Sequence, residues 1–325
     1  MRINFFTVIF LLISFTVPSI SGEIIVQSKY GDVRVKKADS TKWVPVEKGS
    51  ILKLKDTIQT ATKSGAMLFI SGSENIVSIE ENSRIVITES LGSSGNKKSA
   101  VLVAAGKIKS RIKKTDPMVE EFITPTAVVG VRGTELLIAV AEEGTTQVGV
   151  LKGEVQVTGD KGEVSLSSNQ ASEVPRLGGP KDKIKFTGEE DWNKWMKDKS
   201  ESIKGHEKEI LEEISILLDS NYRLIDSLEQ DKEKIKLRME ELKNDTSEES
   251  ATELTKLITD RSRLIIQAQN IDLKNQALID IAENIYSKKP KDKELKNIYK
   301  KMKDKFEKYH SRYTKNKKSG CLNIF

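Results

Sequence analysis

The spacing of apolar residues in this 325-residue chain changes once, near residue 187. Upstream of that point apolar and polar residues alternate, as in 31–35 and 147–151, a pattern that indicates strands with one buried face. Downstream, Leu and Ile recur every three or four residues, which indicates amphipathic helices. The sequence therefore predicts a multi-domain fold, with an all-β domain over residues 23–186 and an α-helical domain over residues 187–325.

The β region consists of short segments rich in Val, Ile and Phe, separated by turns that contain Gly, Ser and Asn. Such segments, at intervals of about 8–12 residues, predict short antiparallel strands in a sandwich or roll. A small element also recurs, in which a glycine and a charged residue precede alternating apolar residues, at Gly31, Gly106, Gly153 and Gly162. Because glycine adopts positive φ at little cost, we expect each one to permit a tight turn into its strand.

One segment of the β region alternates cations with Ile and Ser, at Lys107, Lys109, Arg111 and Lys113. On a strand these four side chains share one face. Two interpretations stay open. The row is either a solvated face or charge-guarded edge, which is common in β proteins, or a surface that binds anionic lipid or polysaccharide.

The helical region contains two apolar stripes, over 203–242 and 254–285, separated by a polar turn. Two stripes of similar length joined by a short turn predict an antiparallel helical hairpin or coiled-coil bundle. Pro290 ends the second stripe, and a third helix with aromatic residues and many lysines follows it.

Capping-box patterns predict that the first helix starts at 187–190 and the second at 246–249. Trp192 and Trp195 lie three residues apart near the first of these starts. We expect this pair to pack against the β domain or the third helix, and a carbohydrate-binding platform is the alternative.

The positive charge of the chain is concentrated in its last helix. The whole sequence has 54 Lys and Arg against 48 Asp and Glu, a net charge of +6. The segment from Lys288 to Lys318 has 14 Lys and Arg against four acids, a net +10, so the rest sums to about −4. This basic tail is either the solvated face of a bundle helix or a contact for an anionic membrane or envelope polymer. Nucleic acid is not an expected partner of an exported chain.

Residues 1–22 have the pattern of a secretory signal peptide. Arg2 precedes an apolar run over 5–17, and Pro18 is followed by small residues up to Gly22. The run is shorter than the roughly 20 apolar residues of a spanning helix, although an uncleaved membrane anchor is the alternative. No cysteine comes directly after the run, which argues against a lipid anchor at this point. We expect an exported, periplasmic protein.

Catalysis is not indicated. The sequence contains no nucleophile elbow, no HExxH pair, no phosphate-binding loop and no dinucleotide fingerprint. His206, His310 and Cys321 are the complete set of His and Cys, which argues against a His/Cys metal site and excludes an internal disulfide. We therefore expect no enzyme, catalytic residue, cofactor or metal, and we expect both histidines to face solvent.

Two ordered groups of residues carry a family resemblance. Residues 43–46, Gly49 and Asp56 precede the string Thr-Pro-Thr-Ala-Val-Val-Gly-Val-Arg-Gly-Thr-Glu over 124–135, and a Gly-Glu-Val follows at 153–155. This order resembles the FecR domain over about 30–160, with 124–135 similar to its signature segment. The positions that we single out in the signature are Pro125, Gly130, Arg132, Gly133 and Thr134.

The signature has two physical interpretations. Glycines on either side of Arg132 suit a bulge or a close approach of backbone, so the segment fixes a β-turn and its register. Alternatively, the guanidinium belongs to a loop that binds an anion or a partner.

The resemblance implies an exported β-rich domain that contacts other proteins. The family's namesakes are inner-membrane sensors that relay occupancy of an outer-membrane iron-siderophore receptor to a cytoplasmic sigma factor. Here the domain follows the predicted signal peptide directly, so we do not carry sigma-factor control over. We expect a non-enzymatic periplasmic binding or scaffolding protein with a protein partner in the envelope and self-association through the helices. The alternatives are a sensory component of receptor-coupled signalling and an envelope-attached protein held by its basic tail.

The signal-peptide pattern predicts that the exported protein starts at Gly22 or Glu23, because the small residues after Pro18 suit cleavage. Intact-mass measurement of protein from the envelope fraction tests this. A mass that retains residues 1–22 would instead indicate an anchored protein.

Overall fold

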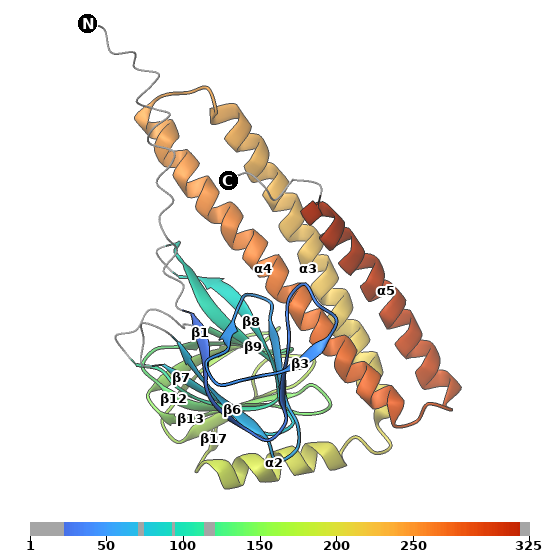
Figure 1. Cartoon of the computed structure of the whole chain (residues 1–325). Helices are drawn as coiled ribbons and strands as arrows, with labels where there is room; N and C mark the ends of the chain where they lie inside the picture. The colour runs from blue at the N-terminus through green and yellow to red at the C-terminus, as the bar shows by residue number, and fades with distance from the viewer. Residues whose placement is uncertain (1–22, 71–74, 93–94, 114–120, 319–325) are drawn as a thin grey trace, which may run out of the picture.

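The structure is a computed structural model, and it describes residues 23–70, 75–92, 95–113 and 121–318, without the side chains of 312–318. Strands occupy the first part of this range and helices the second, which confirms the predicted fold class (Figure 1). The predicted signal peptide over 1–22 and Cys321 lie outside the described residues.

The β region is built from short strands. Their bounds are β1 Ile24–Tyr30, β2 Val33–Lys36, β3 Trp43–Pro45, β4 Ile51–Leu52, β5 Thr57–Thr60, β6 Gly65–Ile70, β7 Ile76–Ile79, β8 Arg84–Leu91, β9 Lys97–Arg111, β10 Glu121–Ile123, β11 Val128–Val131, β12 Glu135–Val140, β13 Thr146–Lys152, β14 Glu154–Thr158, β15 Glu163–Ser167, β16 Gln170–Val174 and β17 Ile184–Lys185.

These strands form two sheets that share β9. The order in sheet A is β4-β1-β6-β7-β9-β12-β13-β16-β17. The order in sheet B is β3-β2-β5-β8-β9-β10-β11-β14-β15. The pairing of β9 with β10 is parallel, and the other pairings of the described strands are antiparallel. The result is a sandwich whose two layers are joined through one strand.

The core of the sandwich lies between the two sheets. Val26, Leu68 and Val150 of sheet A and Ile85 and Val157 of sheet B are all 0% exposed and belong to one apolar cluster. Removal of each such side chain from water stabilises the fold by about 1.5–3 kcal/mol. The apolar residues of the alternating sequence pattern are therefore the ones that point into the core.

Gly106 lets β9 pass from one sheet to the other. Before this residue β9 pairs with β8, and after it β9 pairs with β7 and β12. Gly106 has φ +85°, and an added Cβ would lie 2.5 Å from the Cα of Ser83. The other three glycines of the recurring element also have positive φ, which confirms their expected backbone role. At Gly106, however, the glycine bends a continuous strand instead of opening a turn.

The helical region contains α2 (Glu189–Glu201), α3 (Glu207–Leu242), α4 (Glu248–Ser287) and α5 (Lys293–Lys318). Helices α3 and α4 form the predicted antiparallel hairpin, and α5 packs on its base (Figure 1). Leu295, Met302 and Phe306 of α5 are buried in the same apolar cluster as Leu211 and Leu218 of α3. The third helix is therefore a bundle helix with its aromatic side inward.

The predicted first helix is in fact two helices. Residues 202–206 separate α2 from α3, and Gly205 there has φ +85°. Packing explains this break, because the apolar side chains before it and after it are buried in different apolar clusters. Trp192 packs on the β domain, whereas Ile203 and Ile210 pack in the hairpin cluster. Helix α4 starts one residue later than predicted, with Ser247 Oγ accepting a hydrogen bond from the Ser250 amide at 3.2 Å.

Helices cover both outer faces of the sandwich. On sheet A, Trp192 of α2 is 2% exposed and packs against Leu137, Ala139 and Phe186, which confirms the predicted contact of this tryptophan with the β domain. On sheet B, α4 packs against β8, β9 and β10, with Ala277 and the partly buried Leu273 on Val86, Leu102, Ala104 and Ile123. The layers therefore run α2, sheet A, sheet B, then the helical bundle (Figure 1).

The hairpin extends beyond the sandwich as an arm. Asn221 and Asn275 are buried between α3 and α4 and form a hydrogen bond of 2.7 Å, which fixes how the helices align. Beyond the end of α5 the two helices continue without a third helix to a turn at 243–247 (Figure 1). None of the described helices combines the length and the apolar run that crossing a membrane requires.

Gly106→Ala is expected to destabilise the protein by about 3 kcal/mol or more, because it adds positive-φ strain to a backbone clash. Gly162→Ala is the matched control, since Gly162 also has positive φ, at +84°, but an added Cβ there has nothing within 4 Å. The control should cost only about 1–2 kcal/mol. Urea unfolding of both variants measures the difference, and equal losses would contradict the pivot role of Gly106.

Candidate functional site

The FecR-like signature lies at a corner between the two sheets. Gly130 pairs with Gln156 inside sheet B, and the chain passes to β12 of sheet A after Val131. Thr134 is 2% exposed, and its Oγ1 donates to the Glu154 carbonyl at 3.0 Å. Gly133 has φ +67°, and its carbonyl lies 2.7 Å from where a Cβ on Gly153 would stand. The contacts of Gly133 and Thr134 therefore hold the β11–β12 corner against the β13–β14 corner.

The start of the signature is a buried network of hydroxyl groups. Pro125 is buried, and the Ala127 amide donates to Thr124 Oγ1 at 2.8 Å. Thr126 and Thr146 are linked at 2.7 Å, and Thr146 is linked to Thr124 at 2.8 Å. A segment with these bonds is a fixed turn. Arg132 differs from its neighbours, because it is exposed and has no ion-pair partner among the described residues.

The cation row at 107–111 lies beside α2 and on an internal strand, so it is not a sheet edge. Lys109 contacts Glu189 of α2 and lies 3.6 Å from Glu80. Lys107 Nζ donates to Asn193 Oδ1 at 2.8 Å and lies 5.2 Å from the centre of the Trp192 ring. The row thus holds the acidic first turn of α2 on the sheet.

A buried cluster of charges joins the β domain to α2 and α3. Arg176, which follows β16, contacts Glu143 in the β12–β13 turn and donates through Nε to Glu213 of α3 at 2.7 Å. The Glu143 side chain is 3% exposed and that of Arg176 is 14% exposed. Lys199 of α2 lies 3.0 Å from Glu173 of β16. We call these five residues the interdomain ion cluster.

Within this cluster, the Glu173 carboxylate is contacted by three side chains. Burial alone raises the pKa of its carboxyl, but hydrogen bonds from Lys181, Trp195 and Lys199 outweigh burial and hold the pKa below its ordinary range. Trp195 Nε1 donates to this carboxylate at 2.8 Å. The charged form is therefore the stable one, and the cluster ties α2 to the sheet.

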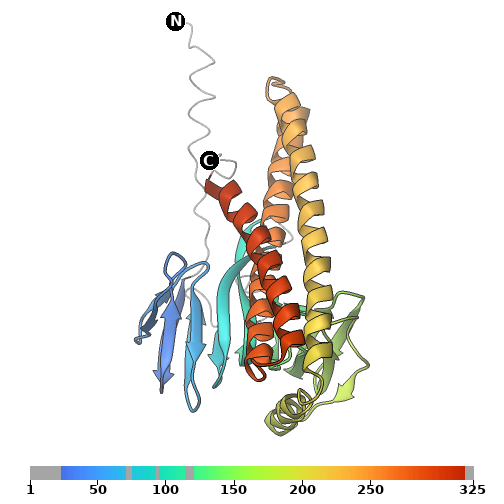
Figure 2. The same cartoon turned by 90° about the vertical axis from the view of Figure 1, so that its right-hand side faces the viewer.

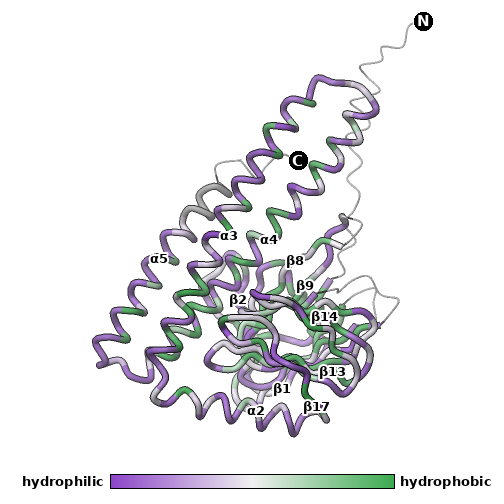
Figure 3. Tube along the Cα trace, turned by 180° about the vertical axis from the view of Figure 1, so that it is seen from behind, coloured by the Kyte–Doolittle hydropathy of each residue, from purple (hydrophilic) through white to green (hydrophobic). Residues whose placement is uncertain are grey.

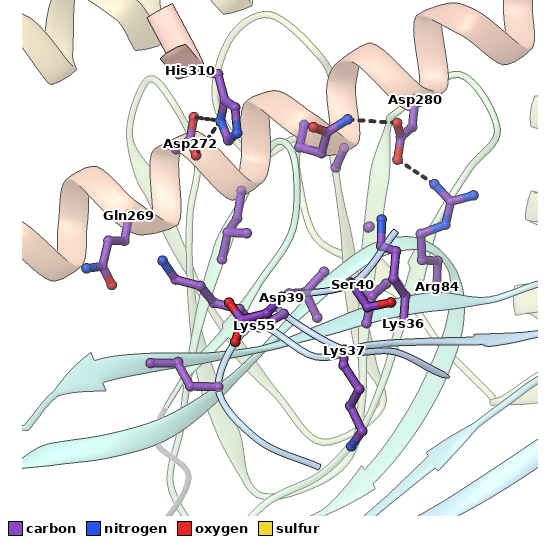
Figure 4. Close-up of a pocket in the computed structure, with 18 of the residues that line it drawn as sticks. Lys36, Lys37, Asp39, Ser40, Lys55, Arg84, Gln269, Asp272, Asp280 and His310 are labelled. Carbon is purple, nitrogen blue, oxygen red and sulfur yellow. Dashed lines mark hydrogen bonds and ion pairs between the residues drawn. The ribbon is translucent and has the colours of Figure 1, made fainter. Parts of the chain in front are cut away.

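A cavity of about 540 Å³ lies between the β domain and the bundle. Its β wall is formed by the 36–43 loop, Leu54, Lys55, Arg84 and Val86, and its helical wall by Gln269, Asp272, Gln276 and Asp280 of α4 with His310 of α5 (Figure 4). This volume falls in the range of ligand pockets, about 300–1,000 Å³. The cavity is amphipathic, with Leu273 and Ala277 between the charged groups.

Ion pairs fix the polar groups of this cavity. Arg84 contacts Asp280, and His310 Nδ1 lies 3.1 Å from the Asp272 carboxylate. The hydrogen bond to Asp272 raises the pKa of His310 above its usual value, despite an opposing effect of burial. His310 stacks on Phe306 and pairs with Asp272 while its side chain stays 43% exposed, so the expectation that it faces solvent is met only in part, whereas His206 is exposed as expected.

The cavity does not assemble a nucleophile with its acid–base pair. Ser40 lies on the β wall, across the cavity from His310 (Figure 4). Its hydroxyl accepts a hydrogen bond from the Lys42 amide at 3.0 Å. Over the residues that the structure describes, no group of three or more His, Cys, Asp and Glu is placed to hold a metal ion. The arrangement can bind and orient a partner group, and two ion pairs on its walls, Arg84 with Asp280 and His310 with Asp272, hold the elements together.

The family model described as FecR protein matches residues 56–156. This range includes β9, the corner at Gly133 and the threonine network. Residues 56–156 are therefore a FecR domain, as the sequence predicted, although the matched range begins later than the expected 30–160. The helices that cover the sandwich lie outside the matched range.

Solved structures add a weak similarity. Two crystal structures of a "putative anti-sigma factor" from Parabacteroides distasonis ATCC 8503 each share 17% sequence identity with this chain, at a TM-score of 0.34. The similarity covers 40% of this chain and 59% of that chain. Among curated proteins, no match is found.

The interdomain ion cluster was not found from the sequence. Glu143 was visible only as one acid of a turn, and Arg176 lies in a Pro- and Gly-containing linker without periodicity. The two residues are 33 positions apart, and their contact exists only once β12, β13 and β16 are paired. The sequence feature that could have indicated this cluster is a single Arg next to Pro175, directly after a strand.

Protonated His310 should stabilise the docking of α5 on α4. Since Asp272 raises the pKa of His310 above 6.5, the contribution is fully present below about pH 6.5 and is lost as pH rises through the higher folded-state pKa. His310→Gln should therefore lower the melting temperature more at pH 5.5 than at pH 8.5. His206→Gln, in the exposed α2–α3 linker, is the control. A loss for H310Q that is equal at both pH values would refute the ion pair.

Proposed function

We propose that this chain is an exported, non-enzymatic binding and scaffolding protein of the cell envelope, which acts through protein contact. The observation that carries the proposal is the helical arm, which is fixed to a FecR domain and projects beyond it (Figure 1). The pattern of residues 1–22 supports export. A projecting helical hairpin supplies contact surface and reach, and does not supply a reaction centre.

The arm is fixed at several points along its base. Thr88 Oγ1 donates to Asn270 Oδ1 at 2.6 Å, and Asn270 Nδ2 donates to the Glu89 carbonyl at 3.0 Å. The β8–β9 hairpin also lies close to α4 further along the helix, because a Cβ added to Gly95 would lie 2.8 Å from Thr259. Force on the arm would therefore reach the FecR domain through packed contacts.

The surface of the arm suits contact with a protein. Leu224 is 50% exposed, Leu237 is 59% exposed and Ile258 is 44% exposed. Arg238 pairs with Glu253 across the two helices at 2.8 Å, which holds the distal part together. These exposed Leu and Ile side chains supply apolar area that a partner protein can cover.

The FecR match over 56–156 supports a second candidate, a sensory component of receptor-coupled envelope signalling. In that case the arm and the domain would transmit partner binding. The neighbouring genes discriminate the two, because a sigma factor or siderophore receptor gene beside this one favours signalling.

The basic helix α5 supports a third candidate, attachment to an anionic surface. Its apolar side is buried, while hydrophilic residues follow most of its length (Figure 3). Exposed lysines without an ion pair among the described residues are Lys293, Lys296, Lys300, Lys301 and Lys308. Each lysine near an anionic membrane contributes about 1 kcal/mol, and salt weakens it. Flotation with anionic vesicles at low and high salt tests this attachment.

Shortening the arm should abolish partner contact without unfolding the protein. Deleting 236–242 together with 250–256 removes seven residues from each helix, about 10 Å of length. Amine cross-linking in the native envelope should link Lys234, which the deletion retains, to one envelope protein, and the yield should fall about tenfold in the short-arm variant.

The control for this prediction is the charge swap Arg238→Glu with Glu253→Arg, which keeps the arm length. Its cross-linking yield should match that of the original protein, and the melting temperatures of both variants should stay close to it. A short-arm protein that cross-links with full yield would refute the proposed function.

A further inference from the structure

We propose that the outer face of β4, β1, β6 and β7 binds an amphipathic helix with acidic side chains from a partner protein. This inference rests on the proposed function as a protein-contact module, and it names a second surface and the chemistry of its partner. The surface, called the open face here, consists of Ile25, Tyr30, Ile51, Met67, Phe69 and Ile76.

The open face is a continuous apolar row across four strands. Ile51 pairs with Ile25, Ile25 pairs with Phe69, and Phe69 pairs with Ile76. Cross-strand partners stand side by side on one face of a sheet. Ile51 is 41% exposed, and the other three are half-buried.

The open face is distinct from the core of the sandwich. The alternate residues Ile24, Leu52, Ile70 and Val77 point inward and are at most 3% exposed. Next to the row, Tyr30 is 60% exposed, and its ring fills the space beside Gly65, where a Cβ would lie 2.7 Å away. The chain thus places large apolar groups on both faces of these strands, although one face meets solvent. None of the described helices covers these N-terminal strands in Figure 2.

Cations border the open face on one side. Ile76 pairs with Arg111 of β9, and Ser78 pairs with Lys109. The Arg111 side chain is 65% exposed, with a contact of 3.4 Å to Glu135. A partner that covers the apolar row therefore meets guanidinium and ammonium groups along this edge, and carboxylates are the groups that complement them.

The other half of the same sheet shows what this surface chemistry binds. There α2 supplies Trp192 for the apolar side chains of β12 and β16, and its Glu189 contacts Lys109. The first turn of α2 is acidic, at Glu189, Glu190 and Asp191. One half of sheet A is thus covered by an amphipathic helix with carboxylates. The open face has the same combination of apolar side chains and bordering cations, but α2 does not cover it.

A second copy of α2 does not fit this role, because α2 is held on its own sheet by Trp192, which is 2% exposed, and by the interdomain ion cluster. The geometry therefore favours a helix of another protein.

The test uses a helix-stapled peptide with the sequence of residues 187–201 as the probe, with binding measured by fluorescence anisotropy. The intact protein should bind it, and Phe69→Glu and Ile51→Glu should each weaken binding about tenfold or more, because a carboxylate would replace an apolar anchor. Val44→Glu is the matched control, since Val44 is 45% exposed on the edge strand of sheet B. Circular dichroism melting confirms that each variant folds.

A photo-cross-linking residue at position 69 then identifies the partner in cells. Mass spectrometry should map the cross-link to an amphipathic helix with carboxylates. No binding of the peptide to the intact protein, equal binding to F69E, or cross-links to lipid or to a second copy of this chain would overturn the inference. Cross-links from Lys234 would persist in each of those cases if the arm functions as proposed, so the two failures are distinguishable.

Discussion

Strand β9 is the constraint on which the rest of this structure depends. It belongs to both sheets, and its outward side chains meet α4 before Gly106 and α2 after it. Leu102 and Ala104 form part of the contact with α4, whereas Lys107 and Lys109 hold α2. Because one strand carries both helix contacts, the conformation at Gly106 fixes how the two helical elements lie relative to each other.

The joint between the two regions combines apolar contact with buried charge. The sandwich and the bundle each have their own core, and two smaller clusters around Leu102 and Trp192 join them. The interdomain ion cluster adds specificity to this joint. Removing one partner of a buried ion pair costs about 3–5 kcal/mol, because the other charge is left without compensation. Arg176, which contacts both Glu143 of the β domain and Glu213 of α3, therefore links α3 to the β12–β13 turn.

The sequence predicted the features that depend on local periodicity. It did not predict the features that depend on contacts between residues far apart in the chain. The change of period near residue 187 separated strands from helices, and the four glycines with a following charge all have positive φ. The break at 202–206 was missed because Ile203 continues the spacing of the α3 stripe, so the stripe alone reads as one helix. The ion pair of His310 was missed because its partner, Asp272, comes from another helix.

The same distinction between local patterns and distant contacts separates the candidate sites. The signature residues Gly130, Gly133 and Thr134 could be found from the sequence, because a family pattern marks them. Their bonds hold a corner, and Arg132 alone extends into solvent. The open face could not be found in this way, since Phe69 and Ile70 are both apolar and the sequence does not say which one points inward.

A sandwich that needs helices on its outer faces is suited to respond to partners. Each outer face of this one carries apolar side chains, and the chain covers them with α2 and α4. A partner on the open face would complete that cover across the cation row from α2, with Lys109 and Arg111 between the two helices. Because Lys109 already contacts Glu189, carboxylates of the partner would compete for the same cation. Binding at this face would thereby change how firmly α2 is held, and α2 is connected through the ion cluster to the base of the arm.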